Sequence, residues 1–165
     1  MLLLSNSDDD DDGSRTSARS GDNTETSADQ ARDVDNPDDI DVPRADDPDG
    51  LGDDERFDRL AQECFDADPS SCDDLYRESE LGSDYEEYGS TCGGRTDEGQ
   101  NGGCTALYPD PTYDDLRHEC ADGDNRACDD LYTDTPINSV DEHFGSVCGG
   151  RSDNELAGSC ESELD

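Results

Sequence analysis

The sequence predicts a small, mostly α-helical, disulfide-rich fold: two tandem repeats of three short helices after a disordered acidic N-terminal segment. The chain's 8 cysteines all lie after residue 63, and only 28% of its residues are hydrophobic. A chain with so few apolar residues cannot bury a large core, and disulfides commonly stabilise such domains. The stretches 57–105 and 113–161 align without a gap, so each cysteine of the first lies 56 residues before one of the second. This internal similarity indicates duplicated units with one shared fold.

The N-terminal segment, residues 1–54, is predicted to be a disordered acidic linker or tail. It contains a run of five aspartates and continues in Ser, Thr, Gly, Asp and Pro without apolar periodicity. Such composition cannot bury enough apolar surface to offset the entropy of ordering the chain. The cysteine-rich repeats then occupy residues 55–110 (repeat 1) and 111–165 (repeat 2).

The first residues, "MLLLSN", bear on where the protein works. They include neither the basic start and apolar run of a signal peptide nor the length of a membrane span. Eight cysteines nevertheless favour an oxidising compartment. We therefore expect an extracellular or cell-envelope protein whose true start lies upstream, with these leucines at the outer end of a membrane helix. The alternative is a cytosolic chain whose cysteines stay reduced.

Each repeat is predicted to form three short helices. In repeat 1, Phe57, Leu60, Ala61 and Cys64 follow the i, i+3, i+4, i+7 pattern of an amphipathic helix. A turn follows, then a second helix in "SCDDLYRE" and a third that starts at the Ser-x-x-Glu capping box of Ser83 and ends at Gly-Gly. Repeat 2 has the same order. The predicted core residues are Leu60, Leu75, Tyr76, Tyr88, Leu116, Leu131, Tyr132 and Phe144.

All the cysteines are predicted to form disulfides: Cys64, Cys72, Cys92, Cys104, Cys120, Cys128, Cys148 and Cys160. The first two of each repeat flank a turn between two helices, and the last two enclose a glycine-rich loop. Neighbours are therefore the expected partners, namely Cys64–Cys72, Cys92–Cys104, Cys120–Cys128 and Cys148–Cys160. Pairing of first with third and second with fourth in each repeat remains an alternative, because spacing alone does not choose between connectivities.

The motif Cys-Gly-Gly-Arg occurs once in each repeat, and only Arg95 and Arg151 among the repeat arginines correspond to each other. One interpretation is structural: each guanidinium pairs with carboxylates of the second helix. The carboxylates in question are Asp73 and Asp74 in repeat 1, and Asp129 and Asp130 in repeat 2. The other interpretation is an exposed anchor that binds a partner or an anionic ligand. The negative charge of the chain repels anions and favours the structural interpretation.

The sequence predicts no enzyme, no cofactor and no specific metal site. There is no Cys-x-x-Cys pair, and His118 and His143 correspond to Gln and Glu in repeat 1, so both are expected on the solvated surface. The stretch from Asp122 begins like a calcium-binding EF-hand loop, but it has Ala127 where the loop requires glycine and Thr133 where it requires glutamate.

The net charge of −37 limits the partners of the chain. It repels nucleic-acid phosphates and anionic lipid headgroups, so we expect neither nucleic-acid binding nor direct lipid binding, unless a membrane anchor precedes this chain. A protein partner, basic in charge, and non-specific cations are compatible with it.

The unit D-x-L-x3-C-x7-C-D-D-L-Y … C-G-G-R … C resembles a cysteine-rich tandem repeat of secreted or membrane-anchored actinobacterial proteins of unassigned function. It is also distantly similar to cysteine-rich Sel1-type repeats, in which a disulfide joins two helices. The first resemblance implies a location outside the membrane. We therefore expect a non-catalytic interaction or cell-envelope module on an acidic stalk. The alternatives are an acidic calcium-binding protein and an intracellular decoy for basic proteins.

Overall fold

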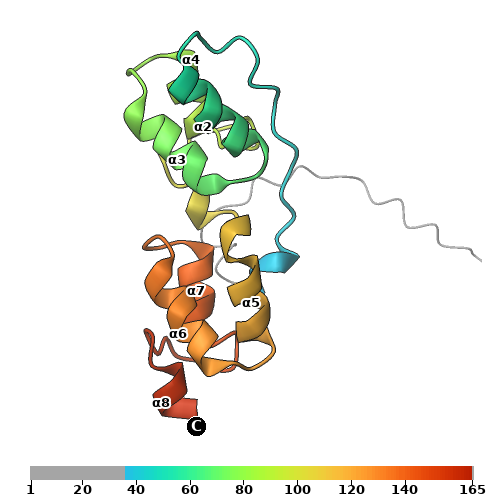
Figure 1. The fold of residues 1–165 in the computed structure, drawn as a ribbon, viewed down its shortest axis with the longest axis vertical. Helices are drawn as coiled ribbons and strands as arrows, with labels where there is room; N and C mark the ends of the chain where they lie inside the picture. Colours follow the sequence, from blue (N-terminus) through green and yellow to red (C-terminus); the bar gives the residue numbers. More distant parts are fainter. Residues whose placement is uncertain (1–35, 165) are drawn as a thin grey trace, which may run out of the picture.

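The computed structural model describes residues 36–164, and its ribbon shows two stacked helical units joined end to end (Figure 1). The described part is all α-helical with short 3-10 turns, as the sequence predicts. Repeat 1 contains α2 (Glu55–Phe65), α3 (Pro69–Glu78), α4 (Asp84–Ser90) and η2 (Cys104–Ala106). Repeat 2 contains η3 (Pro111–Tyr113), α5 (Asp114–Ala121), α6 (Asn125–Asp134), α7 (Val140–Ser146) and α8 (Cys160–Leu164). A further turn, η1 (Pro37–Asp39), precedes them.

Side-chain caps set the helix starts. The Asp54 carboxylate accepts the backbone N–H groups of Arg56 and Phe57 at the start of α2. Asp68 caps α3, which also has proline at its first position. The Ser83 hydroxyl accepts the N–H of Glu86 at the start of α4, as the predicted capping box requires. Because the first N–H groups of a helix have no partner within it, each cap satisfies a donor that would otherwise rely on water.

The second and third helices of each repeat touch backbone to backbone. A Cβ atom added at Gly89 in α4 would lie 2.6 Å from the backbone N of Tyr76 in α3. The corresponding atom at Gly145 in α7 would lie 2.7 Å from the backbone N of Tyr132 in α6. Only glycine allows this close approach. The glycine before each Ser-x-Cys-Gly-Gly-Arg stretch is therefore required by packing.

The disulfides join neighbouring cysteines: Cys64–Cys72, Cys92–Cys104, Cys120–Cys128 and Cys148–Cys160. The first pairing is confirmed and the alternative pairing is wrong. The Cα atoms of the two turn-flanking pairs are 4.8 and 4.7 Å apart, which suits adjacent ends of an antiparallel helix pair. Of the predicted core residues, Leu75, Tyr88, Leu131 and Phe144 are buried; Leu60, Tyr76, Leu116 and Tyr132 are partly buried.

Residues 36–54, here called the strap, begin with η1 and continue as an extended segment, and they contact both repeats (Figure 1). The prediction of disorder through residue 54 is wrong for this part, whereas residues 1–35 lie outside the described residues. The physical reason is that Ile40, Val42 and Leu51 pack against the apolar cluster of repeat 1, and Ala45 is buried. These apolar residues are too scattered for any periodicity, but the repeat supplies the surface on which they are buried.

Candidate functional site

The two Cys-Gly-Gly-Arg loops are loop 1 (residues 92–95) and loop 2 (residues 148–151), and they share one backbone conformation. Three consecutive residues have positive φ in each: 55°, 74° and 76° in loop 1, and 55°, 66° and 74° in loop 2. The N–H of Gly93 donates to the carbonyl of Tyr88, and that of Gly149 to Phe144, which closes the end of each third helix. Glycine adopts this left-handed conformation without a Cβ penalty, so the Gly-Gly pair is a conformational requirement.

Arg95 binds backbone carbonyls, not carboxylates. Its guanidinium donates to the carbonyls of Cys64 and Phe65 at 2.9 and 3.0 Å, to that of Cys92 at 2.7 Å and to that of Pro43 at 2.9 Å. Cys64 and Phe65 end α2, where the last carbonyls lie outside the regular helical hydrogen-bond pattern and, with the helix dipole, favour a cation. Burial lowers the pKa of Arg95 from its ordinary value. The predicted pairing of this arginine with Asp73 or Asp74 is therefore wrong.

The first aspartate of each "CDDLY" stretch serves another purpose. The buried Asp73 carboxylate accepts the N–H of Cys104 at 2.7 Å, and the N–H and hydroxyl of Thr105 at 3.3 and 3.0 Å. Asp129 likewise accepts the N–H groups of Cys160 and Glu161, at 2.6 and 3.1 Å. Burial raises the pKa of Asp73, and these hydrogen bonds act in the opposite direction. Each aspartate ties the segment of the fourth cysteine to the second helix.

Loop 1 holds the strap. The N–H of Asp46 donates to the carbonyl of Gly93 at 2.8 Å, the Tyr88 hydroxyl donates to the carbonyl of Asp46 at 2.7 Å, and Arg95 Nε donates to Pro43. Ala45 is only 7% exposed and packs against Gly93. A Cβ atom added at Gly93 would lie 3.1 Å from the Cβ atom of Ala45. Burial raises the pKa of Tyr88 to about 12. Loop 1 is thus a binding surface for an extended peptide, used within the chain.

Loop 2 has the same shape but different surroundings. Arg151 is exposed, its Nε donates to the carbonyl of Cys148 at 2.7 Å, and its Nη2 lies 3.2 Å from the sulfur of Cys128. The three atoms nearest to a Cβ added at Gly149 all belong to Cys120 of the same repeat. Within residues 36–164, no hydrogen bond joins the strap to loop 2. The sequence-predicted pairing of Arg151 with Asp129 or Asp130 does not form.

A buried arginine that the sequence does not single out joins the strap to repeat 2. The Arg117 side chain is 2% exposed and donates to Asp38 of the strap, to Asp141 and to the carbonyl of Asp110, each at 2.8 Å, and it also pairs with Asp114. Position 117 corresponds to alanine in repeat 1, so the repeat pattern gave no signal of it. Asp141 also accepts the N–H of Asp110, which lies in the connection between the repeats.

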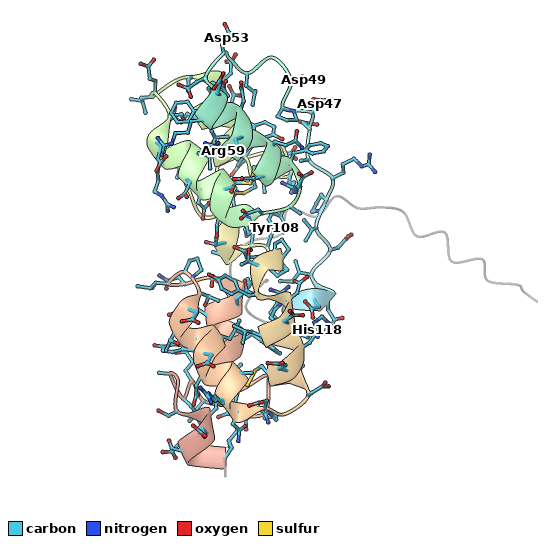
Figure 2. All side chains as sticks on the ribbon, viewed as in Figure 1. Asp47, Asp49, Asp53, Arg59, Tyr108 and His118 are labelled. Carbon is cyan, nitrogen blue, oxygen red and sulfur yellow. A yellow bond between two sulfur atoms is a disulfide. The ribbon has the colours of Figure 1, made fainter. Side chains whose placement is uncertain are left out.

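The histidines and the EF-hand-like stretch show no site. His118 is 70% exposed beside η1 (Figure 2), whereas His143 is 26% exposed and lies 3.3 Å from a Glu155 oxygen. Asp124 caps α6 by accepting the N–H groups of Arg126 and Ala127. Among the residues that the structure describes, no three His, Cys, Asp or Glu side chains are grouped so that they could hold a metal ion.

The chain matches no protein-family model, and no similar curated protein or solved structure was found. The resemblance to actinobacterial repeats stays a prediction. Within residues 36–164, no helix has the length and apolarity that are needed to cross a bilayer. The four disulfides indicate an oxidising environment, of the kind found outside the cytoplasm.

Proposed function

We propose that this protein is a non-catalytic extracytoplasmic interaction module whose Cys-Gly-Gly-Arg loops bind extended polypeptide segments. The observation that carries the proposal is the strap on loop 1. There, the Arg95 side chain, the Gly93 carbonyl and the Tyr88 hydroxyl hold an extended segment through its main chain. Because the same loop is repeated in the same conformation, the chain offers this arrangement twice.

The disulfides next to the two loops support a binding role. In each repeat one disulfide joins the loop cysteine to the fourth cysteine. The other disulfide lies at the turn between the first two helices, and one of its sulfur atoms lies close to the first glycine of the loop. A loop restrained in this way loses little conformational entropy when it binds a segment, which favours affinity. Four disulfides also make the fold dependent on an oxidising compartment.

The charge of the surface limits the class of protein that can bind. The strap carboxylates Asp47, Asp49 and Asp53 lie exposed on the outside of the molecule (Figure 2). With a net charge of −37, the whole chain attracts basic proteins and repels acidic ones. The partner that fits best is a neutral or basic polypeptide with an extended segment.

The test is a selection of displayed random peptides on the oxidised full chain. The matched control is the same chain after reduction and alkylation of its thiols. Peptides enriched on the oxidised chain and not on the control support the proposal. The absence of any such peptide contradicts it. Intact mass of the natively isolated protein tests the location, since four disulfides lower the mass by about 8 Da relative to eight thiols.

A further inference from the structure

We propose that loop 2 binds an extended segment of a partner protein, with a small residue against Gly149 and a main-chain carbonyl on Arg151. The inference rests on the proposed function and assigns it to one repeat and one peptide chemistry. Loop 1 supplies the template, because the strap segment around Ala45 shows how such a loop holds a peptide.

The strap on loop 1 shows which features a peptide needs in order to bind such a loop. The carbonyl of Pro43 accepts from Arg95, and the N–H of Asp46 donates to the Gly93 carbonyl, so both contacts are to main-chain atoms. Between them, Ala45 is buried against Gly93. A larger side chain than alanine would meet the glycine backbone, so the small residue sets the register. No hydrogen bond from the described residues reaches the Asp46 carboxylate, so the site does not require an acid there.

Loop 2 has the backbone conformation of loop 1 and is not covered by the strap. Its φ angles match those of loop 1 within 8°. Gly149 is partly exposed, whereas the corresponding Gly93 is buried beneath the strap; Gly94 and Gly150 are both exposed. Arg151 makes two hydrogen bonds to residues of repeat 2, compared with the four that Arg95 makes. The Nε of Arg151 donates to Cys148, whereas that of Arg95 donates to Pro43 of the strap, so the donors left for a bound segment belong to Nη1 and Nη2.

The charge of the chain selects a partner protein over a second copy. Two chains of net charge −37 repel each other, so a strap supplied by another copy is disfavoured. In addition, the strap of a second copy is already bound to loop 1 of that same copy. Because the strap and the loop belong to one chain, the effective concentration of the strap at that loop is high. A neutral or basic segment has neither disadvantage.

One contact differs between the loops and provides a gain-of-function test. Tyr88, whose hydroxyl binds the carbonyl of Asp46, is replaced in repeat 2 by Phe144, which is 3% exposed. A Phe144→Tyr change restores a donor at the corresponding place. Since one hydrogen bond contributes modestly in water, we expect it to tighten peptide binding by about two- to tenfold.

The experiment titrates two synthetic peptides into the ¹⁵N-labelled, oxidised full chain: residues 41–47, and the same sequence with every aspartate replaced by asparagine. We expect shifts of the Gly149, Gly150 and Arg151 signals, with tighter binding of the neutral peptide. Arg151→Gln should abolish these shifts, and Phe144→Tyr should strengthen them. Arg126→Gln is the matched control, because this exposed arginine in α6 pairs only distantly with Asp130, at 3.8 Å.

Several results overturn the inference. Shifts confined to Gly93 and Gly94 would mean that free peptide only exchanges with the strap on loop 1. Shifts at loop 2 that persist in Arg151→Gln and do not respond to Phe144→Tyr would show that the peptide does not bind loop 2 in the way that the strap binds loop 1. Changes in the signals of residues 1–35 on Arg151→Gln would assign the loop to the chain's own N-terminal segment. If displayed peptides are selected but none binds loop 2, this inference fails while the proposed function stands.

Discussion

Replacement of Asp73 by alanine tests the most specific structural role in the repeats. The carboxylate is 2% exposed and accepts three hydrogen bonds, from the N–H of Cys104 and from the N–H and hydroxyl of Thr105. Hydrogen bonds to a charged group contribute about 1.5–3 kcal/mol each, but they are not additive, and the variant no longer bears the cost of burying a charge, which offsets part of the loss. We therefore expect Asp73→Ala to lower the free energy of unfolding by about 3 kcal/mol.

The neighbouring aspartate is the matched control. The Asp74 side chain is 48% exposed and pairs with Arg77 three residues later on the surface of α3. Such exposed pairs contribute about 0.5 kcal/mol or less, so Asp74→Ala should leave stability nearly unchanged. Asp129→Ala in repeat 2 should lie between the two, because this carboxylate accepts two hydrogen bonds and is only partly buried.

Guanidinium chloride unfolding of the oxidised chains, followed by far-ultraviolet circular dichroism, measures these effects. A loss of about 3 kcal/mol corresponds to a midpoint shift of about 1 M for a domain of this size. The denaturation midpoint of Asp73→Ala should therefore be clearly lower than that of Asp74→Ala. Equal midpoints for the two variants would refute the role assigned to Asp73.

Three further perturbations test the strap, the buried charges and the helix contact. Arg117→Ala should cost about 3–5 kcal/mol because it leaves Asp141 buried without its cation, and the added change Asp141→Asn should restore much of this in thermal unfolding. Gly145→Ala should destabilise by more than 1 kcal/mol through its clash with α6, while Ser146→Ala at the next position, which removes only one hydroxyl hydrogen bond to the His143 carbonyl, should destabilise less. The folded-state pKa of Tyr88, about 12, exceeds the ordinary 10, so its stabilisation of the strap is full below pH 10 and is lost as pH rises towards 12. Burial also raises the pKa of Tyr85, Tyr108 and Tyr113, so tyrosine absorbance at 295 nm should show several late-titrating phenols, one fewer in Tyr88→Phe; an unchanged number would contradict this.

The sequence was sufficient for features that depend on neighbouring residues. The spacing of Cys64 and Cys72 places one turn between two helices, so their pairing followed from local geometry and is confirmed. Ser83 caps α4 because the Ser-x-x-Glu pattern acts within a single turn. In each case, the interaction joins residues separated by fewer than ten positions.

The sequence was insufficient for contacts between distant segments. Arg95 was expected beside the carboxylates of α3, but it donates to the carbonyls of Cys64 and Phe65 at the end of α2. Arg117 gave no pattern at all, because its partners Asp38 and Asp141 lie 79 and 24 positions away. A chain rich in aspartate offers many equivalent carboxylates, and only packing selects among them.

The two copies of one helical unit, each with two disulfides, can be read from the sequence, because helical periodicity and cysteine spacing are local properties. That the two copies are not equivalent is visible only in the folded chain. The strap passes over loop 1, buries Gly93 and engages Arg95, whereas Arg151 of loop 2 stays exposed. The reason is that the strap precedes repeat 1 and reaches it through scattered apolar residues, whose burial depends on a surface that exists only after the repeat has folded.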